Sequence, residues 1–174
     1  ISRFKSDLER YYKMGFRPVT LRSYLDNTME LAPGASPIIF TFDDSHPSQF
    51  RYLDDGTIDP DCAVGIWSDF AKKHLDFPVR ATFFVLPDSG PFGPKADAAK
   101  KLAQLKEWGC EVGSHTLTHR KLSSLPPAEV EKELSGAVKA IEGYGFNPYA
   151  IALPYGLSPK DPAQLKKHHA VALL

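Results

Sequence analysis

The chain has 174 residues, enough for one domain with a hydrophobic core of ordinary size. Acidic and basic residues balance at 21 each, so no excess of charge favours nucleic acid or an anionic membrane surface as a partner. No apolar run reaches the roughly 18 residues that a transmembrane helix needs. Two cysteines, Cys62 and Cys110, are too few for a disulfide-dense scaffold or an all-cysteine zinc site, and they either pair or remain free.

Stretches with helical spacing of apolar residues alternate with dense apolar runs, which is typical of an α/β domain with a parallel sheet. Gly15 and Gly109 suit C-terminal helix caps, Pro127 suits a first helical turn, and Pro18 keeps its segment extended. In chain order we expect a helix over 4–14, an extended segment over 16–20, a helix over 21–26, a buried strand over 37–42, a loop over 45–60, a helix over 62–75, a strand over 79–86, a loop over 87–94, a helix over 96–108, a strand over 110–113, a helix over 127–142, a strand over 149–153, a helix over 159–168 and a strand over 170–174.

The number of these units is too small for a closed barrel, which needs eight of them and about 250 residues. The chain also stops inside the apolar segment 170–174, which requires a neighbouring strand to bury it. We therefore expect a single domain over 1–174 whose C-terminal part is missing. Expressed alone, such a piece is expected to fold poorly or to be nearly inactive.

Two adjacent carboxylates, Asp43 and Asp44, directly follow the expected strand 37–42. Enzymes of the α/β class keep their chemistry just past the carboxyl ends of strands. A turn there can bring both side chains to one edge with different neighbours, and hence with different pKa values. An isolated Asp-Asp pair is otherwise more typical of a solvated loop or a helix cap.

His115 and His119 follow the expected strand 110–113. Histidines four residues apart converge on one side of a helical turn, a spacing that suits a single metal ion, although alone it is more typical of two surface histidines. The segment 153–156, Leu-Pro-Tyr-Gly, would alone indicate only a turn. Taken together, one carboxylate and two imidazoles leave open positions on a divalent metal, and the second carboxylate is free to act as a base toward water.

Four segments resemble, in order and rough spacing, the motifs of the NodB-type polysaccharide deacetylases, carbohydrate esterase family 4. They are Thr41-Phe42-Asp43-Asp44, Ala81-Thr82-Phe83-Phe84-Val85, Ser114-His115-Thr116-Leu117-Thr118-His119 and Leu153-Pro154-Tyr155-Gly156. The lead-in from Asp7 to Leu21 is also similar to that of bacterial members. The resemblance spans about residues 4 to 174 and implies a distorted, incomplete (β/α) barrel.

The resemblance also implies an activity. Members are metal-dependent hydrolases that remove acetyl groups from N-acetylated sugars in chitin, peptidoglycan or related polymers, and they are secreted, periplasmic or associated with the cell envelope. Asp43 is then the general base, and Asp44, His115 and His119 bind one divalent ion, with zinc expected first and cobalt, nickel or iron as alternatives. The backbone N–H of Tyr155, which follows Pro154, would help to form the oxyanion hole.

The chain departs from the family pattern in two places. Position 152, where the family has an arginine that orients the base, is Ala152. The later Leu-x-His motif, which supplies the general acid, has no match, and we expect it beyond Leu174. His168 and His169 lie in a Lys-Lys-His-His stretch of an expected helix and are not expected to be that acid.

The loop over 45–61 is longer than the connection expected there. Its acidic residues do not follow an EF-hand pattern, so a solvated loop is favoured over a calcium site. His46 lies two residues past an expected ligand and is a weaker candidate for a metal or substrate contact. Trp67 and Trp108 fall in expected helices and are predicted to pack in the core rather than to stack on sugars.

Three functions stay open at this point. The first is a carbohydrate N-deacetylase. The second, motivated by Ala152, is a non-catalytic or weakly active member that retains a metal or binds glycans. The third, motivated by the long loop over 45–61, is a deacylase of a small or unusual acylated substrate.

Overall fold

The computed structural model describes residues 2–173. Its helices are α1 (Ser2–Lys13), α2 (Leu21–Leu25), α3 (Ala63–Ala71), α4 (Lys95–Glu107), α5 (Pro127–Glu142) and α6 (Ala163–Lys166), with 3-10 turns at Leu122–Ser124 and Pro154–Gly156. Its strands are β1 (Phe16–Val19), β2 (Ser36–Ile39), β3 (Thr41–Phe42), β4 (Thr82–Val85), β5 (Glu111–Ser114), β6 (Ala150–Ala152) and β7 (Val171–Leu173). The α/β class predicted from the alternating pattern is confirmed.

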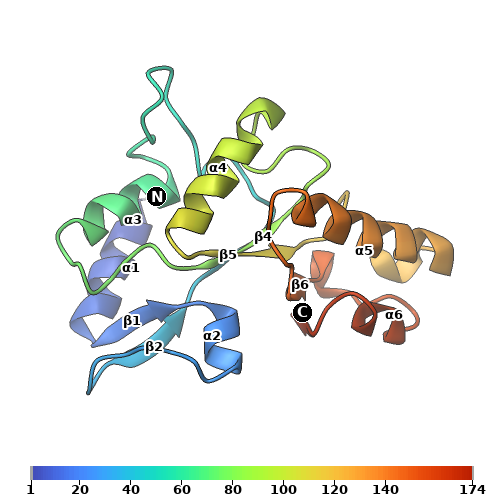
Figure 1. The fold of residues 1–174 in the computed structure, drawn as a ribbon, viewed down its shortest axis with the longest axis horizontal. Coiled ribbons are helices and arrows are strands. Elements are labelled where there is room, and N and C mark those ends of the chain that lie inside the picture. Colours follow the sequence, from blue (N-terminus) through green and yellow to red (C-terminus); the bar gives the residue numbers. More distant parts are fainter. Residues whose placement is uncertain (1, 174) are drawn as a thin grey trace.

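The main sheet contains five parallel strands in chain order, β3-β4-β5-β6-β7. Parallel neighbours joined in this order, each through a helical crossover, curl in one direction like part of a (β/α) barrel. Figure 1 shows α1 and α3 toward one end of the molecule and α5 and α6 toward the other, with the sheet between them. The predicted incomplete barrel is therefore confirmed as a curled, open half-barrel.

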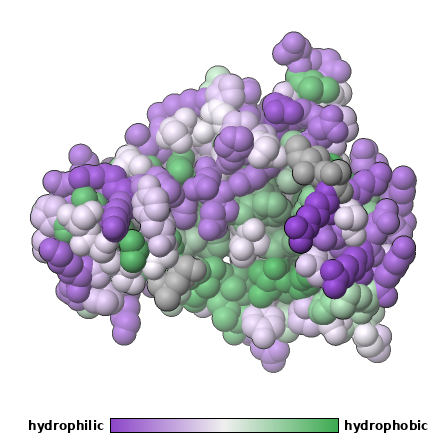
Figure 2. Space-filling view, turned by 180° about the vertical axis from the view of Figure 1, so that it is seen from behind, coloured by the Kyte–Doolittle hydropathy of each residue, from purple (hydrophilic) through white to green (hydrophobic). Residues whose placement is uncertain are grey.

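The two faces of this sheet pack differently because successive strand residues point to opposite sides. Phe83 and Val85 of β4 face the large core formed with α3 and α4. Phe84 points the other way, into a smaller cluster that includes Ala150 and Ala152 of β6. Ile151 of β6 packs with residues of α5 and α6 in a third cluster. Seen from behind, the molecule has a continuous hydrophobic area in its middle, bordered by hydrophilic surface (Figure 2).

The strand expected over 37–42 is divided between two sheets, which corrects the prediction of one buried strand. β2 pairs with β1 in a separate two-stranded parallel sheet, while β3 pairs with β4 in the main sheet. Phe40 lies between them, and the centroid of its ring is 4.6 Å from that of the Trp67 ring. The residues of β2 and β3 are at most half-buried. The change of partner interrupts the strand, and local sequence does not encode it.

Two helices are shorter than predicted. α3 ends at Ala71 instead of residue 75, because the chain turns to bury Phe77, whose N–H donates to the carbonyl of His74 at 2.8 Å. α6 begins at Ala163 instead of residue 159, because Pro162 is suited only to a helix start and the Asp161 carboxylate accepts from the N–H of Ala163 at 2.9 Å. The other predicted helices and strands are found within a few residues of their expected bounds.

The tryptophans pack as predicted. Trp67 is fully buried in the large core, and Trp108 lies against the same core with its ring 6.2 Å from that of Phe50. Cys62 and Cys110 are both buried and free. Burial raises the pKa of the Cys110 thiol to about 12, which leaves it protonated and unreactive at neutral pH. None of the helices in residues 2–173 has the length and apolar character required to cross a bilayer.

Gly113 of β5 should be intolerant of a side chain. A Cβ there would lie 2.5 Å from ring atoms of Phe84, its partner on β4. Gly113→Ala is therefore expected to lower the free energy of unfolding by about 1–3 kcal/mol, measured by chemical denaturation. Phe84→Leu should relieve the clash with the ring. The loss of unfolding free energy caused by Phe84→Leu should therefore be smaller in the Gly113→Ala background than in the parent. Strictly additive effects of the two substitutions would contradict this account.

Candidate functional site

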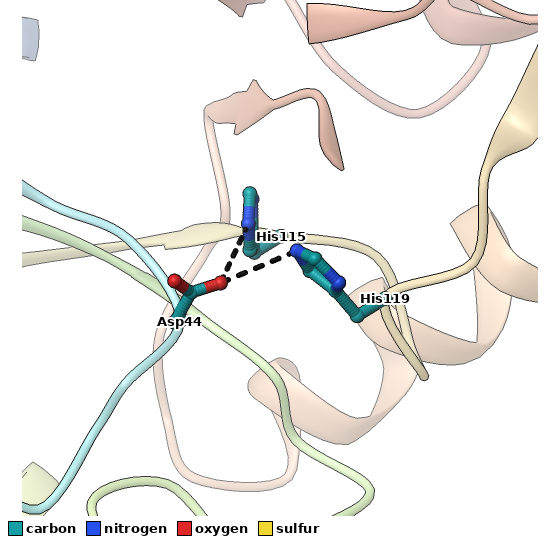
Figure 3. Close-up of side chains that lie close together, drawn as sticks. All are labelled: Asp44, His115 and His119. Atoms are coloured by element: carbon teal, nitrogen blue, oxygen red, sulfur yellow. Dashed lines mark ion pairs between the residues drawn. The ribbon is translucent and has the colours of Figure 1, made fainter. Parts of the chain in front are cut away.

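Three loops meet at the carboxyl edge of the main sheet, as the motif positions predict. Asp43 and Asp44 follow β3, His115 follows β5, and Tyr155 follows β6. Figure 3 shows Asp44, His115 and His119 pointing toward one another, with Asp44 on the loop after β3 and both histidines on the loop after β5. Residues far apart in the sequence are thus brought together because parallel strands all end at the same edge.

The ligating atoms of the three residues form a compact group. The Nε2 atoms of His115 and His119 lie 3.2 Å and 3.3 Å from Oδ1 of Asp44. All three ligand atoms lie within 4.8 Å of one another. The His115 side chain is 5% exposed, whereas His119 and Asp44 are 30% and 58% exposed. A group of two nitrogens and one oxygen that is open on one side is suited to a divalent ion that must also reach water or substrate.

The backbone carbonyl of Ala152 fixes the tautomer of His115. Nδ1 of His115 lies 2.9 Å from this oxygen. A carbonyl oxygen can only accept a hydrogen bond, so Nδ1 carries a proton, and in the neutral imidazole Nε2 is left with a lone pair on the side of Asp44. A histidine that donates its other N–H in this way is the usual arrangement for a metal ligand.

The histidine segment corrects one prediction: His115 and His119 converge through a loop and not through a helical turn. Thr116 and His119 adopt left-handed backbone angles, with φ of 67° and 62°. The Thr116 hydroxyl accepts a hydrogen bond from the N–H of His119 at 3.1 Å. These left-handed residues reverse the chain, so that two histidines four apart face the same point without helical geometry.

The segment after β3 that carries Asp43 and Asp44, which we call the aspartate arm, is anchored through Ser45. Asp44 and Ser45 also have left-handed backbones, with φ of 68° and 46°. Ser45 is buried, its hydroxyl accepts from the N–H of Leu86 at 3.2 Å, and its carbonyl accepts from the N–H of Phe92 at 2.7 Å. These bonds tie the residue next to Asp44 to the loop after β4.

Lys101 supports this anchor from α4. Its ammonium group is buried and donates to the carbonyl of Phe92 at 2.8 Å. Burial lowers the pKa of Lys101, and the Asp97 carboxylate 3.9 Å away partly offsets the effect. The buried lysine thus fixes the same turn that Ser45 binds.

Asp43 lies beside the three converging residues and retains exposed surface. The protein around its carboxylate nevertheless removes enough water to raise its pKa, the Asp44 charge adds to this effect, and His115 and His119 oppose it. A raised pKa moves a carboxylate toward the range of a general base. The side-chain amide of Gln49 donates to the backbone carbonyl of Asp43 and so restrains its position from the long loop.

Tyr155 lies next to His119, with ring centroids 4.9 Å apart. Its backbone is left-handed, with φ of 61°, and its side chain is 66% exposed, whereas Pro154 is buried. A cavity of about 480 Å³ opens beside these rings and also includes Arg120 and Leu157. The site therefore opens onto a surface hollow with aromatic and cationic walls.

Other candidate residues lie elsewhere. His46 turns Nδ1 toward Ser48, accepting from its N–H at 3.1 Å, and is not among the three converging residues. His168 lies 2.8 Å from a carboxylate oxygen of Glu131 on α5, and His169 is buried, which lowers its pKa to about 4. Within residues 2–173, Asp43 forms no ion pair with an arginine, in accordance with the alanine at position 152.

The family model described as polysaccharide deacetylase matches residues 31–173. The chain belongs to the polysaccharide deacetylase family. A chitooligosaccharide deacetylase from Bradyrhizobium is 33% identical over 116 residues, which are 66% of this chain and 48% of that protein. A polysaccharide deacetylase structure from Bacillus cereus superposes with a TM-score of 0.73 at 21% identity, over 98% of this chain and 49% of the other.

A third relative carries a different description. It is a structure from Bacillus anthracis named as a pseudoenzyme of carbohydrate esterase family 4, and it matches with a TM-score of 0.57 at 18% identity, over 82% of this chain and 44% of its own. Because both structural matches are below 25% sequence identity, they show that the fold is shared and nothing more. The chain spans about half the length of the Bradyrhizobium and Bacillus cereus relatives.

The sequence analysis missed the residues that hold these loops. Ser45, Gln49 and Lys101 support the aspartate arm, and Glu133 of α5 contacts the histidine loop. The available signals were a lysine and a glutamate on otherwise apolar helix faces, since a charged residue is seldom fully buried without partners.

Ser45→Ala tests the anchor of the aspartate arm. Removing the hydroxyl leaves the N–H of Leu86 without its acceptor, and the free energy of unfolding should fall by about 1–3 kcal/mol. Ser89→Ala is the matched control, because that exposed hydroxyl bonds to the carbonyl of the same Leu86 and its loss should cost less than about 0.5 kcal/mol. Equal denaturation midpoints for both variants would contradict the anchoring role.

Proposed function

We propose that this protein is a metal-dependent hydrolase that removes N-acetyl groups from a polysaccharide or oligosaccharide built from N-acetylglucosamine. The observation that carries the proposal is the convergence of Asp44, His115 and His119 at the carboxyl edge of a polysaccharide deacetylase fold. Residues 1–174 would form one domain of this kind.

The three residues fit a borderline divalent cation, with zinc first among cobalt, nickel and iron. Two imidazole nitrogens and one carboxylate oxygen are ligands that zinc prefers, and a catalytic zinc keeps further positions open. The bond from His115 to the Ala152 carbonyl presents the required lone pair. When bound, the ion would supply Lewis acidity to the acetyl carbonyl and to water.

Asp43 is the proposed general base. Amide hydrolysis requires attack of water on the carbonyl carbon, and the Asp43 carboxylate would take the proton that this water gives up. The backbone N–H of Tyr155 would donate to the carbonyl oxygen as negative charge develops on it, with Pro154 holding the turn. The C–N bond would then break as the departing nitrogen takes up a proton from solvent in exchange for the one that Asp43 accepted, and acetate and a protonated amine would leave.

The hollow beside His119 is the proposed place for the glycan. Its exposed Tyr155 ring and the Leu157 side chain offer an apolar surface next to the ligating residues. Sugars present apolar C–H faces, so such a wall can orient an N-acetylated unit with its carbonyl toward the ion. We expect an N-acetylated glycan as the substrate and no role for nucleic acid. Because such glycans occur outside the cytoplasm, a secreted, periplasmic or cell-envelope location would suit this activity.

A non-catalytic or weakly active member that binds metal or glycan is the second candidate. Ala152 favours it, because Asp43 then lacks the arginine that family resemblance leads us to expect. The pseudoenzyme description of the Bacillus anthracis relative gives the idea a precedent. Acetate release from N-acetylglucosamine oligomers separates the two candidates.

Replacing His119 by alanine tests the ligand set. With one of three ligands lost, the metal retained after dialysis should fall to roughly a tenth or less, measured by atomic emission. Because imidazoles bind metals only when neutral, metal retention by the parent should also fall as pH drops through the histidine range. His46→Ala is the control and should retain metal. Full metal content at the same position in His119→Ala would refute the assignment.

Replacing Asp43 by asparagine tests the base. The amide keeps the shape but accepts no proton, so the rate of acetate release should fall by about 100-fold or more while metal content stays near the parent value. Asp54→Asn, an exposed change in the long loop, should leave both unchanged. An Asp43→Asn protein with full activity would show that this carboxylate is not the base.

A further inference from the structure

Glu133 is a buried carboxylate to which the proposed reaction gives no role. It lies on the face of α5 that also buries Val130, Leu134, Ala137 and Ile141, and it is 4% exposed. A glutamate at this depth requires hydrogen-bond partners to compensate the loss of water. All the hydrogen-bond partners that Glu133 has within residues 2–173 come from the loop between the two histidines.

Glu133 accepts three hydrogen bonds from two consecutive residues. Its Oε2 accepts from the backbone N–H of Leu117 at 3.1 Å and from that of Thr118 at 2.9 Å. Its Oε1 accepts from the Thr118 hydroxyl at 2.5 Å. One side chain therefore clamps the midpoint of the His115–His119 segment.

These bonds complete the pairing of the backbone N–H groups of residues 115–119. The N–H of His115 donates to the Val85 carbonyl, that of Thr116 to the Ser114 hydroxyl, and that of His119 to the Thr116 hydroxyl. The two remaining N–H groups, of Leu117 and Thr118, both donate to Glu133. Without the Glu133 carboxylate, two consecutive N–H donors would lose their acceptor. The backbone conformation that turns both imidazoles toward Asp44 would then no longer be held.

A second contact one turn along α5 supports this attachment. The Leu117 side chain packs on Gly136, where an added Cβ would approach its Cδ2 to 2.9 Å. The helix therefore holds the loop by a polar clamp at Glu133 and by close packing at Gly136. Neither residue belongs to the three that converge.

We propose that Glu133 is a positioning residue that sets the metal affinity of the site by holding the loop between His115 and His119. This inference rests on the proposed function in so far as a metal is bound there. Glu133 would act through the loop, because its carboxylate bonds to Leu117 and Thr118. Its partners can be satisfied by hydrogen bonds alone, so a neutral glutamine of the same shape should replace it: the amide oxygen can accept both N–H groups, and the amide nitrogen can donate to the Thr118 hydroxyl.

The first measurement is Zn²⁺ affinity by competition titration of the purified protein. Glu133→Ala should bind at least about 10-fold more weakly than the parent, the loss typical of outer-shell changes, whereas Glu133→Gln should stay within about 3-fold. Ile141→Ala is the matched control, because it truncates a buried residue of the same helix far from the loop. Its stability should fall while its affinity is kept.

Each other result decides against the proposal. Parent-like affinity in Glu133→Ala, or an equal loss in Ile141→Ala, would mean that Glu133 is only a structural residue. Affinity in Glu133→Gln as weak as in Glu133→Ala would mean that charge and not positioning matters. If circular dichroism shows that Glu133→Ala does not fold, Thr118→Val removes one of the three bonds and should weaken affinity measurably; unchanged affinity would then overturn the proposal.

The second measurement uses metal-free protein and separates this inference from the proposed function. Amide hydrogen exchange of Leu117 and Thr118, followed by NMR, should be at least about 10-fold faster in Glu133→Ala than in the parent, and unchanged in Glu133→Gln. If the parent bound no divalent ion, the proposed function would fail while these rates still decided whether Glu133 holds the loop. Unaltered protection in Glu133→Ala would overturn it.

Discussion

Parallel pairing of β3 through β6 is the constraint on which the site depends. It places the carboxyl ends of these strands at one edge, so that each following loop has to turn there. The lengths of the crossovers determine how far apart the contributing residues lie in the sequence, but not where they meet. Asp44 and His119 are 75 positions apart and still lie side by side because β4 alone separates their strands.

The sequence predicted the residues that converge but not the structures that hold them. Asp44, His115 and His119 carry groups that can bind a metal and follow expected strands, which is a local signal. The division of the strand over 37–42 depends on β1 and β4, whose pairing no local pattern encodes. The left-handed backbone of Thr116 was equally hidden, because a threonine adopts it only when surrounding contacts enforce it.

Position 152 shows that a residue can act on the site through its backbone alone. The methyl side chain of Ala152 has no group that could pair with a carboxylate, yet its carbonyl determines which nitrogen of His115 donates to it. The contribution of β6 to the ligand arm therefore tolerates any side chain that keeps the strand in register. A pairing with the Asp43 carboxylate, by contrast, would require a cationic side chain at position 152. The two halves of the site can thus vary separately, a separation that is relevant to a family containing both enzymes and a pseudoenzyme.

The left-handed residues have an energetic consequence for the whole fold. Five residues of the site have positive φ angles, which are unfavourable for any residue other than glycine: Asp44, Ser45, Thr116, His119 and Tyr155. Each such residue costs about 1 kcal/mol or more of folding free energy. Released from their anchors, these loops would relax to ordinary backbone angles and their side chains would disperse. Part of the stability that the packing of α3, α4 and α5 provides is therefore offset by the strain in these loops. Partial opening is therefore expected to begin in these loops, so that the geometry at the edge of the sheet would be lost before the sheet itself.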